Sequence, residues 1–267
     1  MQGPKNIFRI KPSNNFCLKG TVMPNKELEQ TLVLIKPDAL KNSLTGYVLS
    51  QLSEFHTGLR FAGAKIVHVN RMLAEEHYAE HKGKVFFPAL IEYITGLSHS
   101  PDSPGTRRVI AFVYQGPDAV KKIRDLAGPT NPLAAREKRP GCIRALGTLV
   151  PLKNASGKVI GERMDNLIHA SASDAEAQRE IKLWFKPHDI PPAMHGYAAE
   201  KCQDHYYFKD KRIFTTYEPG SACLLAPGQI AWKSDLDALR LLHQGKPSAC
   251  SFEAVVAKYL INEEQEA

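Results

Sequence analysis

Two almost wholly apolar segments constrain the fold of this 267-residue chain more than any other feature. Residues 31–35 read Thr-Leu-Val-Leu-Ile, and residues 109–114 read Val-Ile-Ala-Phe-Val-Tyr. Apolar runs of this length, without polar alternation, are typical of strands that are covered on both faces. We therefore expect two buried strands, of which the first is central in its sheet and is ended by Pro37.

Segments with helical periodicity lie between these strands. Val48, Leu52 and Phe55 recur at helical spacing, and Gly58 is expected to end that helix. Further segments follow the same alternation, with helices expected at residues 73–81, 86–93 and 117–126 and a strand at residues 59–69.

Composition places the chain among ordinary soluble globular proteins, with 43% hydrophobic and 24% charged residues. The formal net charge of +7 suits an anionic ligand such as a nucleotide. It suits nucleic acid, or a basic surface kept for solubility, equally well. Charge alone therefore does not identify the ligand.

The five cysteines are scattered without paired spacing, which favours a reducing compartment. The N-terminal segment lacks an apolar core of signal-peptide length, and no apolar run approaches the length of a membrane span. We therefore expect a cytoplasmic protein that has no membrane partner.

One histidine, His169, follows a short apolar run and precedes a helix start. Ser173, with Glu176 three residues later, matches the capping-box pattern of a helix N-terminus. His169 is therefore predicted at a strand-to-helix turn, where unpaired N–H groups and the helix dipole suit a phosphate group. From this local pattern alone, a packed structural histidine is the more common alternative.

Several motifs in sequence order resemble those of the nucleoside diphosphate kinase family. Ile-Lys-Pro-Asp ends the first strand at residues 35–38, and Asn-Leu-Ile-His-Ala-Ser occupies residues 166–171. The other matching motifs are Glu-His-Tyr at 76–78, Phe-Phe at 86–87, Thr-Asn-Pro at 130–132, Pro-Gly-Cys-Ile-Arg at 140–144 and Glu-Ile-Lys-Leu-Trp-Phe at 180–185. The resemblance covers residues 30–187.

The resemblance implies a ferredoxin-like α/β sandwich, an α+β arrangement in which a four-stranded antiparallel sheet carries helices on one face. It also implies ping-pong phosphotransfer, in which His169 takes the γ-phosphate of a nucleoside triphosphate such as ATP. The phosphohistidine then passes the phosphoryl group to a nucleoside diphosphate. Mg²⁺ would bridge the nucleotide phosphates, without ligands from the protein.

Roles for the other residues follow from the matching positions. Lys36 would reach the sugar hydroxyl and the γ-phosphate, Asn166 would contact the ribose, and Tyr78 would lie near the transferred phosphate. The remaining roles are phosphate binding by Arg124, Thr130 and Arg144, base binding by Phe86 and Leu90, and orientation of the histidine and its surroundings by Ser171 and Glu180.

Three regions extend beyond the short family members: a loop at residues 98–108, a hairpin at residues 145–163 and an extension at residues 191–267. We expect an arm at residues 1–29, a catalytic domain at residues 30–190, and an extension that packs on this domain or on a neighbouring subunit. The connection from Thr130 to Arg144 is also longer than usual. In the family this region contacts neighbouring subunits, so the homo-oligomer could be a hexamer or smaller.

The extension carries enough periodic and aromatic residues to fold. We expect a hairpin around residues 209–211 and a helix from Ser234 to His243 that Ser234 caps. An apolar stripe follows, for the core or for a subunit contact, and consists of Phe252, Val255, Val256, Tyr259 and Leu260.

Two groups of residues have some of the features of a metal site. His77 and His81 have the i,i+4 spacing of a zinc pair but no evident third ligand. A site that begins at Cys202 and His205, with Cys223 and Cys250, has loose spacings. We therefore expect no metal bound by the protein itself.

An alternative function is that of a catalytically idle relative that binds protein or nucleic acid. The net charge and the added segments support it. The full set of matching site residues favours the enzyme instead, and it disfavours nucleic acid as a partner.

Overall fold

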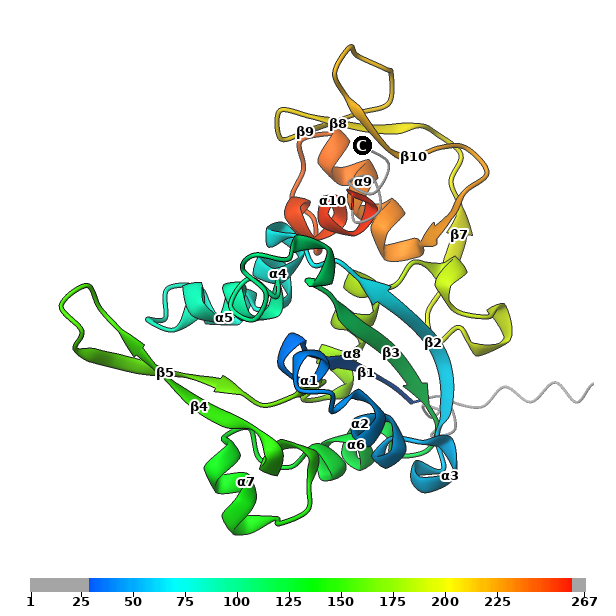
Figure 1. Ribbon diagram of the computed structural model, residues 1–267. Coiled ribbons are helices and arrows are strands. Elements are labelled where there is room, and N and C mark those ends of the chain that lie inside the picture. Colours follow the sequence, from blue (N-terminus) through cyan, green and yellow to red (C-terminus); the bar gives the residue numbers. More distant parts are fainter. Residues whose placement is uncertain (1–28, 261–267) are drawn as a thin grey trace, which may run out of the picture.

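The computed structural model describes residues 29–260, so the arm expected at residues 1–29 lies outside the described residues except for Glu29 (Figure 1). A four-stranded antiparallel sheet forms the centre of the fold. Its strands, in spatial order, are β2 (Arg60–Val67), β3 (Val109–Gln115), β1 (Gln30–Ile35) and β6 (Ile168–Ala170). The prediction that the first apolar segment is a central, buried strand is confirmed, since β1 lies between β3 and β6.

Helices cover both faces of this sheet, and the expectation of helices on one face was wrong. Leu32 and Leu34 of β1 pack in one hydrophobic cluster, whereas Val33 and Ile35 pack in another. Successive side chains of a strand point to opposite faces, so a wholly apolar strand requires cover on both sides. The first face carries α4 (Arg71–His77), α5 (Phe87–Ile94) and α8 (Asp174–Trp184), and the second carries α1 (Pro37–Lys41), α2 (Thr45–Gln51) and α6 (Ala119–Ala127).

Some helix boundaries differ from those expected. The helix expected to contain Phe55 ends at Gln51, and a separate short helix, α3 (Glu54–Thr57), begins after Ser53. The Ser53 side chain caps α3 by accepting the backbone N–H of His56, and this change of direction leaves Phe55 fully exposed. Likewise, the helix expected at residues 73–81 ends as α4 at His77, and η2 (Ala79–His81) follows it as a separate 3-10 turn.

Two of the added regions meet beside the sheet. Strands β4 (Thr148–Lys153) and β5 (Val159–Asp165) form the expected hairpin, which projects away from the core in Figure 1. In the other added region, η3 (Pro104–Thr106) is the regular element. Nε2 of His99, in this loop, lies 2.7 Å from the carboxylate of Asp165 in β5, so a hydrogen bond ties the loop to the hairpin. The long connection from Thr130 to Arg144, which was expected to be a loop, contains α7 (Pro132–Lys138) and the start of η4 (Ile143–Leu146).

The extension folds around a hydrophobic cluster of its own and packs on α4 and α8. Val255, Val256 and Tyr259 of the expected stripe are buried in that cluster, so this chain itself covers them. The expectation that Ser234 caps its helix was wrong, because the helix begins one residue earlier, after Trp232. The elements are η5 (Pro187–Asp189), η6 (Pro192–Met194), β7 (Ala199–Lys201), β8 (Tyr206–Lys209), β9 (Arg212–Phe214), β10 (Ala222–Leu225), β11 (Ile230–Trp232), α9 (Lys233–His243) and α10 (Phe252–Leu260).

The extension forms two small sheets, one from β8, β9 and β10 and one from β7 and β11. The hairpin expected around residues 209–211 is confirmed as β8 and β9. Within residues 29–260, none of the helices combines the length and the apolar character that crossing a bilayer requires.

Candidate active site

A strained residue sets the direction of the segment that carries His169. Leu167 has a φ of 68°, in the left-handed region that non-glycine residues seldom adopt. Its N–H donates to the buried carboxylate of Asp38 at 3.0 Å, and its carbonyl accepts the N–H of Lys36 at 2.8 Å. These bonds from the end of β1 hold the unusual conformation in place.

His169 itself lies within β6, opposite Leu34 of β1, rather than at a strand-to-helix turn as expected. Antiparallel pairing with β1 extends the strand through Ala170, and α8 begins only after Ser173. Ser173 does cap this helix, since its side chain accepts the N–H of Glu176. The N-terminus of α8 therefore does not directly adjoin the imidazole.

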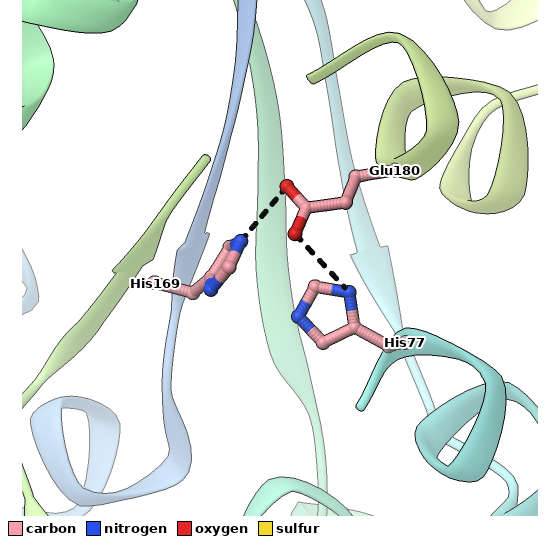
Figure 2. Close-up of side chains that lie close together, drawn as sticks. All are labelled: His77, His169 and Glu180. Carbon is pink, nitrogen blue, oxygen red and sulfur yellow. Dashed lines mark hydrogen bonds and ion pairs between the residues drawn. The ribbon is translucent and has the colours of Figure 1, made fainter. Parts of the chain in front are cut away.

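A carboxylate holds one nitrogen of the His169 ring. Nε2 of His169 lies 2.9 Å from Oε2 of Glu180 (Figure 2). The Ser171 hydroxyl donates to the same oxygen at 2.6 Å. Burial alone would raise the pKa of Glu180, but His169, His77 and Ser171 outweigh burial and lower it to about 2. The ionised carboxylate therefore fixes the proton on Nε2 and leaves Nδ1 with its lone pair.

His77 completes this group from α4. Its ring packs edge-to-face on the ring of His169, with 4.4 Å between centroids, and its Nδ1 lies 3.9 Å from Glu180. Within residues 29–260, the group of side chains that could hold a metal ion is His77, His169 and Glu180. This group differs from both metal sites considered from the sequence, the pair of His77 with His81 and the group around Cys202.

A cavity of about 450 Å³ opens beside His169. All the side chains expected to contact nucleotide line it, namely Lys36, Tyr78, Phe86, Leu90, Arg124, Thr130, Arg144 and Asn166. Glu180 lines it as well. Ser171 does not, because it is fully buried beneath β1, where its hydroxyl oxygen accepts the N–H of Leu32.

Basic side chains line the cavity, namely Lys36, Arg124, Arg144 and Arg163. Burial, together with the charge of Arg144, lowers the pKa of Lys36 to about 7. Lys36 donates to Oδ1 of Asn166 at 2.8 Å, and the amide of Asn166 donates to the carbonyl of Thr130. Burial and the charge of Arg124 lower the pKa of Arg144 to about 10, so this guanidinium stays charged at neutral pH. Arg124 is exposed, and so is free to move toward an anion.

The other wall of the cavity is aromatic and apolar. Burial raises the pKa of Tyr78, so its hydroxyl keeps its proton and can donate a hydrogen bond. Phe86 is partly exposed at the cavity, with Leu90 one helical turn further along. An aromatic face and an aliphatic side chain suit a flat, partly apolar group such as a nucleobase.

Comparison with known proteins gives the same assignment as these contacts. The family model described as nucleoside diphosphate kinase matches residues 29–190, more than half of the chain. The chain belongs to the nucleoside diphosphate kinase family. It is therefore a nucleotide-binding phosphotransferase with nucleoside diphosphate kinase activity, and the idle alternative is not favoured.

Curated nucleoside diphosphate kinases are similar over most of their own length. The chain is 40% identical to that of Pyrococcus furiosus over 186 residues, which cover 70% of this chain and 97% of the relative. It is 35% identical to that of Thermococcus kodakarensis over 202 residues, which cover 76% and 99%. Among solved structures, the Aquifex aeolicus nucleoside diphosphate kinase has a TM-score of 0.48 at 30% identity, with coverage of 61% and 99%.

Sequence reasoning missed several side chains that shape this kinase site. Asp38 lies in the Ile-Lys-Pro-Asp motif, yet its bond to Leu167 depends on contacts between residues far apart in sequence. Arg163 of the hairpin lines the cavity and pairs with Asp165 at 2.6 Å, and Asp165 in turn pairs with His99. A basic residue in an expected surface hairpin carried no signal for this position.

Proposed function

We propose that this kinase transfers the γ-phosphate of a nucleoside triphosphate such as ATP to a nucleoside diphosphate through a phosphohistidine at His169. The observation that carries the proposal is the bond between Glu180 and Nε2 of His169 at the cavity. In Figure 2 the second ring nitrogen of His169 points away from Glu180. That nitrogen, Nδ1, would be the nucleophile.

The step balances as an in-line displacement. Nδ1 of His169 forms a bond to the γ-phosphorus while the bond to the bridging oxygen breaks, and the nucleoside diphosphate leaves with that electron pair. Glu180 offsets the positive charge that develops on the ring, and Ser171 holds the carboxylate in place. A second nucleoside diphosphate then takes the phosphoryl group by the reverse step.

Different cavity residues would bind the phosphates, the sugar and the base of the nucleotide. Lys36 would bind the γ-phosphate and the sugar hydroxyl, and Asn166 the ribose. The expected contacts to phosphates are those of Arg124, Thr130, Arg144 and Tyr78, and those to the base are those of Phe86 and Leu90. Stacking recognises the face of a base rather than its edges, so we expect little discrimination between bases.

Mg²⁺ would reach the site bound to the nucleotide phosphates. The group of side chains in the described chain that could hold a metal contains two imidazoles, whereas Mg²⁺ prefers oxygen ligands. Glu180 is already engaged by His169 and Ser171. When bound, the ion would neutralise phosphate charge beside Lys36 and the two arginines.

The phosphohistidine gives the direct test. Brief incubation with ATP labelled in the γ-phosphate should leave label on the protein that is lost in acid but stable in base. Addition of an unlabelled nucleoside diphosphate should transfer that label to the nucleotide. Acid-stable label, or label that no diphosphate removes, would contradict the proposal.

Lys36 predicts a pH effect on nucleotide binding. Its pKa of about 7 leaves it mostly neutral at pH 8, whereas nearby phosphates favour the charged form and raise that pKa. ADP binding at pH 8 should therefore take up about one proton, and affinity should rise as pH falls toward 7. Calorimetry in buffers of different ionisation enthalpy measures the uptake. Lys36→Met should abolish it, and equal uptake by both proteins would remove Lys36 from the phosphate site.

We also propose that the protein acts in the cytoplasm as a homo-oligomer, a hexamer or smaller, with a catalytic domain at residues 30–190 and the extension at residues 191–267. Exposed apolar residues support self-association, because Phe61 and Ile66 lie exposed on β2, at an edge of the sheet. Such an edge is a common place for contact between copies of a chain.

A further inference from the structure

Three buried hydrogen-bond donors at the cavity have no partner within residues 29–260. They are Nε2 of His77, the hydroxyl of Tyr78 and Nε of Arg144. A buried donor without an acceptor is costly, and at the wall of a cavity a bound ligand can supply that acceptor. Tyr78 and Arg144 already have an expected partner in the phosphates. His77 has none.

The hydrogen bonds of His77 determine which of its nitrogens carries the proton. The indole N–H of Trp184 donates to Nδ1 of His77 at 3.2 Å, so Nδ1 must be the acceptor. Burial lowers the pKa of His77 well below its ordinary value, and His169 acts in the same direction. The ring is therefore neutral, with its single proton on Nε2.

The position of this proton is what matters for the reaction. His77 is fully buried in α4, and its ring meets that of His169 edge-to-face at 4.4 Å. In Figure 2 the nitrogen that is turned away from Glu180 lies on the side of the His77 ring that faces His169. The unpaired Nε2–H thus faces the nucleophile at the wall of the nucleotide cavity.

We propose that His77 donates its Nε2–H to an oxygen of the phosphoryl group as that group moves onto and off His169. This inference rests on the proposed phosphohistidine function. His77 would add a donor to those of Lys36, Tyr78 and Arg144 around the transferred group. Because His77 is a neutral donor, it places no positive charge next to His169 and does not disfavour the positive charge that develops on that ring.

Two substitutions separate donation from packing. His77→Phe keeps an aromatic ring but has no N–H, whereas His77→Gln keeps a neutral N–H donor and an acceptor for Trp184. In single-turnover labelling at saturating ATP, we expect His77→Phe to be slower by about 10- to 100-fold. We expect His77→Gln to remain within about fivefold of wild type. His68→Phe, at an exposed position outside the cavity, is the matched control and should label normally.

Melting temperatures are measured in parallel, and the labelling is run well below the lowest of them. Labelling of His77→Phe at the wild-type rate would overturn the proposal, because the N–H would then have no role. Equal slowing of both His77 variants would also overturn it, because packing alone would then explain the effect. Absence of label on the wild-type protein would instead be a failure of the proposed function itself.

A measurement on the wild-type protein needs no variant. With ¹⁵N-labelled histidine, NMR should show His77 in the tautomer protonated at Nε2, and that proton should shift downfield when His169 is phosphorylated. A His77 signal unchanged by phosphorylation, or a proton on Nδ1, would overturn the proposal.

Discussion

Replacement of His169 by alanine should lower phosphotransfer from ATP to a nucleoside diphosphate by roughly four orders of magnitude or more. The imidazole is the proposed nucleophile. The neighbouring imidazole of His77 cannot take its place, because its Nδ1 accepts from Trp184. A coupled assay of diphosphate conversion, at saturating concentrations of both nucleotides, measures the loss.

The fold should survive this substitution. The His169 side chain is 16% exposed beside an open cavity, and Glu180 keeps its hydrogen bond from Ser171. Far-ultraviolet circular dichroism and thermal melting serve as controls. Transfer that persists within about tenfold of wild type in a folded protein would exclude His169 as the nucleophile.

Replacement of Trp232 by alanine should destabilise the protein by about 3–5 kcal/mol. Trp232 is fully buried in the cluster that includes β1 and α8, although it belongs to the extension. Its indole N–H donates to the carbonyl of Phe185 at 2.7 Å, immediately after α8. The substitution would leave a large cavity and an unpaired buried carbonyl where the extension meets the kinase fold.

Urea denaturation of wild type, Trp232→Ala and Trp232→Phe measures this effect. The phenylalanine variant keeps most of the volume and loses the hydrogen bond, so it should be destabilised less. Both variants should still form phosphohistidine under conditions in which they are folded. Unchanged stability of Trp232→Ala would show that this contact contributes little, and a folded variant that cannot be labelled would place the extension in the catalytic mechanism.

Much of the fold was predictable because local pattern and tertiary environment agree. The apolar run of β1 demands cover on both faces, and it lies between β3 and β6 with helices on each side. Phe55 shows the limit of such reasoning. Phe55 fits a helical apolar stripe in the sequence. A new helix begins after the cap at Ser53, however, and the Phe55 side chain is exposed to solvent.

Sequence motifs by themselves determined the family and named the side chains that the cavity gathers, because residue type and order are enough to match a motif. Tertiary structure alone decided how those groups behave. Lys36 has a pKa of about 7 because it is buried near Arg144, and Leu167 holds its left-handed conformation because Asp38 accepts its N–H. The tautomer of His77 depends on Trp184, 107 residues away. Burial and contacts between distant residues determine the charge of a side chain and the position of its proton. A local sequence pattern contains no information on either burial or such contacts.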